Sequence, residues 1–167
     1  MNRFLAFYYG GFPDEKGRLL AEITRQDDLW LEVTHDYIQW LFPTREISKV
    51  MPGSPLIDKV VEAAFHGDEL LRRHLLVSFI RMLSFYGLVR RDGKIVKGAN
   101  WCERKSNWFI EGTHNDLRIT RILKSLSALG LRDEAEKLML CLEELRVSET
   151  DCGVNSTAYQ YWRSALQ

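Results

Sequence analysis

One predicted helix in the second half of the chain carries several side chains that could bind an anion. They recur every three or four residues and so share one helical face: His114, Arg118, Arg121 and Ser125, with Asn115 beside them. Two guanidinium groups and an imidazole in a line could hold a carboxylate or phosphate by bidentate hydrogen bonds, and the helix start near Thr113 would add its own attraction. The alternative is structural, with the arginines pairing with acids of another helix or facing water, and this is the more frequent use of such residues.

A second chemically suggestive pair is His35-Asp36. Helical metal phosphohydrolases use such a pair, but that chemistry needs further His and Asp ligands, and no histidine precedes His35. Neighbouring side chains on a helix also diverge by about 100°. We therefore expect no metal and no cofactor. His35 and Gln39 remain candidate polar contacts for a ligand, or for a loop carbonyl.

Aromatic residues could supply the apolar part of a ligand site. Trp40, Trp101 and Trp108 are the candidates, because tryptophan joins a large apolar face to a polar tip. Aromatic residues at helical spacing are more often part of a core, and that alternative remains open.

The elements that must position these side chains are almost all helical. Apolar residues recur at helical intervals, and capping residues, glycine and proline mark the boundaries. We expect an irregular start over 1–17 and an all-α bundle of about seven helices, with a small β-hairpin near 88–96 around Asp92-Gly93. The segments expected to be helical are about 17–23, 28–42, 54–67, 68–86, 100–108, 115–129, 132–147 and 156–166.

The segment 28–42 is expected to form one buried helix at the centre of the core. Its apolar residues cover more than the roughly 100° arc of a surface helix: Leu29, Trp30, Val33, Tyr37, Trp40 and Leu41. Pro43 then disfavours helix at Phe42 and ends the segment.

Composition indicates one ordinary globular domain over residues 1–167. The formal net charge of zero argues against a protein that grips nucleic acid, although 90–105 is basic and 132–151 is acidic. We expect these two regions to be solvated faces that also attract each other. Three unpaired cysteines, with no signal peptide and no membrane-spanning run, lead us to expect a cytoplasmic protein.

Several strings in order along the chain resemble one known family. They are Phe7-Tyr8 with Pro13-Asp14 and Gly17-Arg18; His35 to Pro43; Met82-Leu83 with Phe85-Tyr86-Gly87; Asn107-Trp108; and His114-Asn115 with 117–126. The chain is similar to the conserved domain of the opioid growth factor receptor, as a stand-alone member of bacterial type. The family name implies opioid peptide binding and membrane association; the family supplies no catalytic residues to carry over.

The function that we expect is a non-enzymatic binding module for a peptide or small anionic ligand. A protein partner on an apolar patch is a further expectation. The alternatives are an enzyme acting on an anionic substrate and a nucleic-acid accessory protein, which the neutral charge disfavours.

Overall fold

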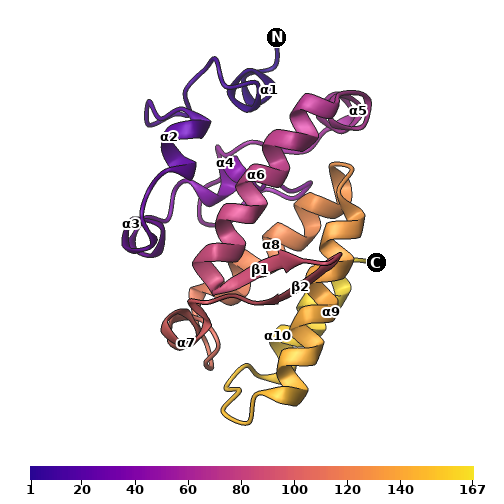
Figure 1. Ribbon diagram of the computed structural model, residues 1–167. Coiled ribbons are helices and arrows are strands. Elements are labelled where there is room, and N and C mark those ends of the chain that lie inside the picture. Colours follow the sequence, from indigo (N-terminus) through magenta and orange to yellow (C-terminus); the bar gives the residue numbers. More distant parts are fainter.

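The computed structural model describes all 167 residues as a mostly helical chain around one hydrophobic core cluster of 44 buried residues. The all-α prediction with one small hairpin is therefore confirmed (Figure 1). The helices are α1 (Arg3–Tyr8), α2 (Leu20–Thr24), α3 (Asp28–Val33), α4 (Ile38–Leu41), α5 (Lys59–Gly67), α6 (Glu69–Tyr86), α7 (Trp101–Arg104), α8 (His114–Ala128), α9 (Arg132–Ser148) and α10 (Ser156–Ser164), with a 3-10 turn at Lys105–Asn107.

Three long helices, α6, α8 and α9, form the frame. Asp68 caps α6 by accepting a hydrogen bond from the backbone N–H of Leu70, and Gly87 ends it in the left-handed conformation at φ 78°. The short turn at Gly130 makes α8 and α9 neighbours, and α10 packs on α8. The short helices α1 and α2 contact α6 on the side away from the hairpin (Figure 1). None of the helices has the length and apolar character needed to cross a membrane.

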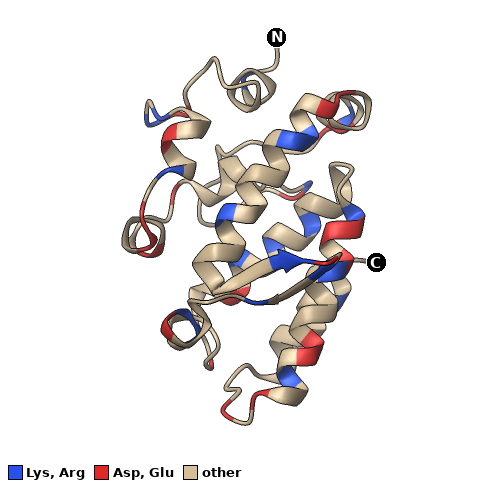
Figure 2. Ribbon diagram, viewed as in Figure 1, with Lys and Arg blue, Asp and Glu red and all other residues tan.

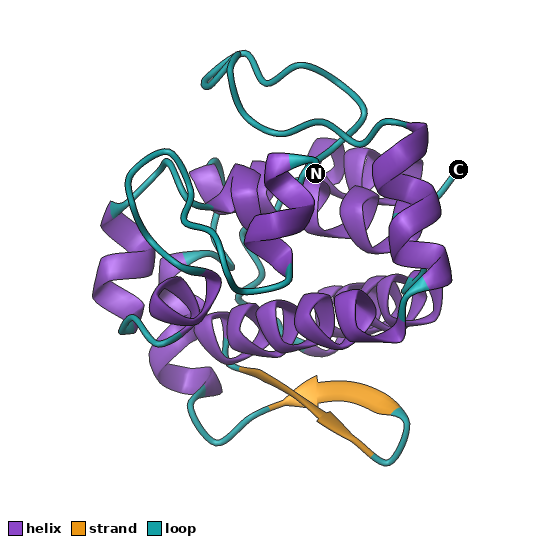
Figure 3. Ribbon diagram, turned by 90° about the horizontal axis from the view of Figure 1, so that it is seen from above, coloured by secondary structure: helices purple, strands orange, loops and turns teal.

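The predicted hairpin is confirmed, with β1 at Leu88–Arg91 and β2 at Lys94–Lys97. Asp92 and Gly93 both have positive φ, 51° and 74°, which is the conformation that an Asp-Gly turn favours in a two-residue hairpin loop. The hairpin lies along one edge of the helical body and contacts α6 and α9 (Figure 3).

The prediction of one helix over 28–42 is wrong. The chain leaves α3 at Thr34, whose backbone is extended (ψ 129°), and re-enters a helix only at Ile38. Leu29 and Val33 are 70% and 62% exposed, so they do not join the core, whereas residues 37–42 are all buried. The break is stabilised by the Tyr37 hydroxyl, which donates to the Leu31 carbonyl, and by donors from α8.

Two other boundaries differ from the prediction because local capping was misjudged. The start is not irregular, since the Asn2 side chain accepts from the N–H groups of the first turn and α1 follows. Helix α5 begins at Lys59 with Asp58 as its cap, five residues after the predicted start at 54. The Ser54 hydroxyl instead donates to the Met51 carbonyl in a turn.

The basic and acidic regions attract each other as expected. Arg90 contacts Glu134 at 2.8 Å, and Lys105 contacts Asp151 at 2.9 Å. Lys97 also pairs with Glu149. Figure 2 shows the basic strands beside acidic positions of α9. The basic charge of 90–105 is therefore partly neutralised within the molecule.

Candidate functional site

A cavity of about 400 Å³ lies between α8 and the segment 35–50. It brings together five of the side chains that the sequence singled out: His35, Gln39, His114, Arg118 and Arg121. The rest of its lining comes from Ile38, Glu46, Ile47, Ser48, Lys49, Val50, Leu117, Thr120 and Lys124. Of the 14 residues that line the cavity, four are Lys or Arg and one is an acid. An anion in the cavity would therefore meet a positive local field.

Arg118 is buried against the break between α3 and α4. Its Nη1 donates to the Leu31 carbonyl at 2.7 Å and its Nη2 to the Thr34 carbonyl at 2.8 Å. The guanidinium also lies over the Tyr37 ring, 5.3 Å from the ring centroid. These contacts replace the helical hydrogen bonds lost at Thr34, so Arg118 holds two segments together and its guanidinium is held in place by the fold.

Arg121 lies about one helical turn further along α8 and contacts one carbonyl where Arg118 contacts two. Its Nη1 donates to the Phe42 carbonyl at 3.0 Å, and it forms no ion pair. Burial lowers the pKa of the Arg121 guanidinium, and the nearby charge of Glu46 opposes that effect only in part. A partly desolvated guanidinium without a carboxylate partner favours the arrival of an anion.

Gln39 adds an unpartnered polar group to the same cavity. The residue is 5% exposed, and its Oε1 has no hydrogen-bond partner. Buried amides are normally hydrogen-bonded, because leaving such an oxygen unpaired costs roughly 1–3 kcal/mol.

Two histidines stand at the rim. The rings of His35 and His114 meet edge to face with centroids 5.0 Å apart, and His114 Nε2 lies 3.2 Å from the Glu32 carboxylate. Burial lowers the pKa of His114, the charge of Arg118 lowers it further, and Glu32 opposes both. The His114 imidazole is therefore neutral at pH 7 and can accept as well as donate a hydrogen bond.

The structure places the remaining predicted residues in the interior. Trp40, Trp101 and Trp108 are at most 4% exposed and pack in the core, so they form no groove. Asn115 is buried and donates to Glu32 and to the Asn107 carbonyl, and Ser125 is buried with an unpartnered hydroxyl. These five residues do not line the cavity.

Sequence reasoning missed the apolar side of the site. Ile47, Val50 and Leu117 are 65%, 74% and 72% exposed and line the cavity. Leu117 interrupts the polar face of α8, which was a signal that could have been used. The loop residues follow no helical or strand period and gave none.

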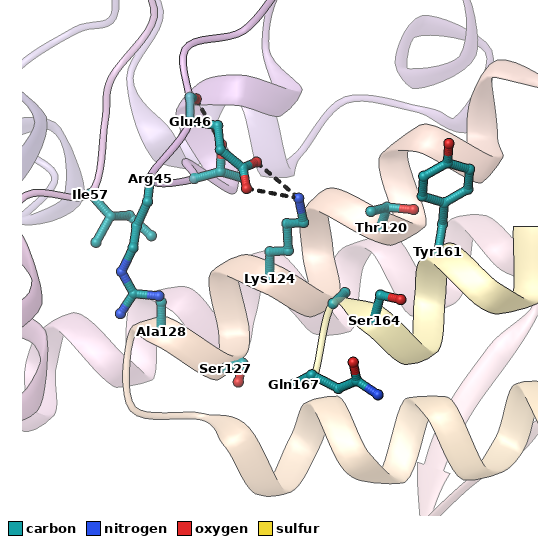
Figure 4. Close-up of a pocket in the computed structure, with 12 residues that line it drawn as sticks. Arg45, Glu46, Ile57, Thr120, Lys124, Ser127, Ala128, Tyr161, Ser164 and Gln167 are labelled. Atoms are coloured by element: carbon teal, nitrogen blue, oxygen red, sulfur yellow. Dashed lines mark hydrogen bonds and ion pairs between the residues drawn. The ribbon is translucent and has the colours of Figure 1, made fainter.

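A second, smaller cavity of about 280 Å³ adjoins the first (Figure 4). Both are lined by Glu46, Thr120 and Lys124. Its other side is rich in hydroxyl groups, including those of Ser127, Tyr161 and Ser164.

Nearly the whole chain matches one known protein family. The model of the opioid growth factor receptor (OGFr) conserved region matches residues 7–167. The opioid growth factor receptor of mouse is 39% identical over 141 residues, which cover 82% of this chain and 22% of that protein. The human opioid growth factor receptor is 38% identical over 155 residues, which cover 89% of this chain and 22% of that protein. The mouse opioid growth factor receptor-like protein 1 is 38% identical over 135 residues, 79% of this chain and 29% of that protein. This chain thus spans less than a third of these relatives. No solved structure matches.

Proposed function

This chain belongs to the family of the opioid growth factor receptor conserved region, and from that membership we propose that it is a non-enzymatic binding module for a peptide or small anionic ligand. The relatives are named as receptors, and the family resemblance supports a ligand-binding role for this domain. The binding site in this proposal is the 400 Å³ cavity between α8 and residues 35–50.

The guanidinium of Arg121, which has one carbonyl contact and no carboxylate partner, is the observation that carries the proposal. Structural arginines elsewhere in the chain meet acids or two carbonyls: Arg81 contacts Asp28 at 2.8 Å, and Arg118 bridges two carbonyls. The Arg121 guanidinium is partly removed from water, and a single carbonyl contact is the only hydrogen bond that offsets this loss of hydration. A carboxylate or phosphate in the cavity would offset that loss further, because charge-assisted hydrogen bonds are strong where water is partly excluded.

The other side chains that line the cavity add hydrogen-bonding, charged and apolar contacts for a ligand. His114 and Gln39 offer neutral hydrogen-bonding groups, and Lys124 adds a second charge. Ile47, Val50 and Leu117 supply the apolar contact that the sequence had assigned to tryptophans. An anionic group attached to an aliphatic one fits this combination.

The test is isothermal titration calorimetry with a capped hexapeptide that has leucine and isoleucine at one end, a central aspartate and serines at the other. A second peptide has asparagine in place of the aspartate. We expect Arg121→Gln to weaken binding of the aspartate peptide about tenfold or more while the protein stays folded; loss of the hydrogen bond to the Phe42 carbonyl should lower the unfolding free energy by roughly 1.5–3 kcal/mol. The matched control is Arg73→Gln, which removes an exposed charge on α6. Equal affinity of the two peptides, or no effect of Arg121→Gln, contradicts the proposal.

One observation favours the enzymatic alternative. The neutral His114 imidazole, oriented by Glu32 and placed at the rim of a positive cavity, has the requirements of a general base. An enzyme would turn over a phosphate or carboxylate ester and lose that turnover in His114→Ala. The binding proposal expects no turnover in either protein.

A further inference from the structure

We propose that Glu46 is a built-in substitute for the ligand's acidic group, and that its displacement joins the two cavities into one groove for an extended acidic peptide segment of about six residues. This inference rests on the proposed function and extends it from a site to a ligand of defined length. The ion pair between Glu46 and Lys124 is the feature that carries it.

Glu46 reaches from its loop to α8 at the boundary of the two cavities (Figure 4). Its carboxylate accepts two hydrogen bonds from Lys124 Nζ, at 2.8 and 3.1 Å. It is the only acid lining either cavity, and its charge is also the one that opposes the desolvation of Arg121. Glu46 therefore contacts one of the two cations, Lys124, and lies close enough to the other, Arg121, for its charge to act on that guanidinium without forming an ion pair with it.

The pair is weak enough to open. The Glu46 side chain is 70% exposed, and exposed ion pairs contribute little to stability because water and salt screen them. Its loop neighbours Arg45 and Ile47 are also exposed, so the side chain can swing away without uncovering the core.

The opened groove has a length that selects its occupant. The lining residues of α8 run from His114 in the first cavity to Ala128 in the second, a path of about 21 Å at a helical rise of about 1.5 Å per residue. An extended peptide advances about 3.4 Å per residue, so about six residues span it. The aliphatic residues at one end, the two cations in the middle and the hydroxyl groups at the other end set the order of side chains expected in the peptide.

The decisive variant is Glu46→Gln, which keeps the side-chain shape and removes the competing charge. We expect it to bind the aspartate hexapeptide, made in both chain directions, about three- to fivefold more tightly than the natural protein does. The asparagine peptide should show no gain. Lys124→Met should weaken binding, and Glu46→Gln combined with Lys124→Met should lose the gain.

The matched control is Glu69→Gln. Glu69 has the same 70% exposed side chain and a 2.8 Å ion pair with Arg73 on α6. If this control tightens binding as much as Glu46→Gln does, the effect is general charge and the inference is overturned.

Length is tested by NMR on the same proteins. The hexapeptide should shift resonances of Ser127, Tyr161 and Ser164 in the second cavity, whereas inorganic phosphate and an aspartate tripeptide should shift only residues of the first. Shifts confined to the first cavity with the hexapeptide overturn the continuous groove. Binding that depends on Arg121 but is unchanged by Glu46→Gln overturns this inference and leaves the proposed function standing; absence of binding in both proteins overturns both.

Discussion

Replacing Arg118 by methionine should cost the protein about a third of a typical domain's stability. The variant removes two charge-assisted hydrogen bonds, which Arg118 donates to the carbonyls of Leu31 and Thr34. Arg118 is buried, with 4% of its surface exposed. Such bonds contribute roughly 1.5–3 kcal/mol each. The Leu31 carbonyl keeps the Tyr37 hydroxyl as a donor, so we take the lower end and expect a loss of about 3 kcal/mol.

Urea unfolding followed by tryptophan fluorescence measures this loss, because four of the five tryptophans are buried. The thermal midpoint should fall by about 6–12 °C for a domain of this size. Arg118→Lys should recover only part of the loss, since an ammonium group cannot reproduce the planar fork that reaches both carbonyls. The control Arg73→Met removes an exposed arginine paired with Glu69 and should change stability by no more than about 0.5 kcal/mol.

A loss below about 1 kcal/mol in Arg118→Met would refute the reasoning. It would mean that the break at residues 34–37 holds its shape without the donors from α8. Arg118 would then be free to serve a ligand, as the sequence had suggested.

Two further predictions concern the backbone and the pH dependence. Gly87→Ala should destabilise the protein by more than about 2 kcal/mol, because an added Cβ at φ 78° would lie 2.8 Å from the Trp101 Cα. Gly93→Ala is the control: its φ is 74° but the space around it is open, so it should cost only the backbone strain of about 1–2 kcal/mol. Equal losses of stability in urea unfolding would contradict this prediction. Burial raises the pKa of Asp116 to about 6 from its ordinary 3.8, so its contribution to stability is full below about pH 4 and is lost as the pH rises through 6. Asp116→Asn should therefore gain stability relative to the natural protein between pH 4.5 and 7.5, and parallel pH profiles of unfolding would contradict it.

Much of the local structure could be predicted from the sequence because it depends on neighbours along the chain. Asp68 and Gly87 bound α6, Asn155 caps α10, and Asp92-Gly93 turns the hairpin. Each of these signals works through a hydrogen bond or a backbone conformation within a few residues. The sequence also placed five side chains that line the cavity among its candidates.

The tertiary structure decided what those side chains do. Helical periodicity treated 28–42 as one helix, since Pro43 is its only evident breaker. The break is stabilised by Arg118, which is 87 positions away from Leu31 along the chain. The same contact turns the predicted ligand arginine into a structural one and leaves Arg121 facing the cavity. Hydrogen bonds between distant segments compete with local helix formation, and only the folded arrangement determines which of them prevail.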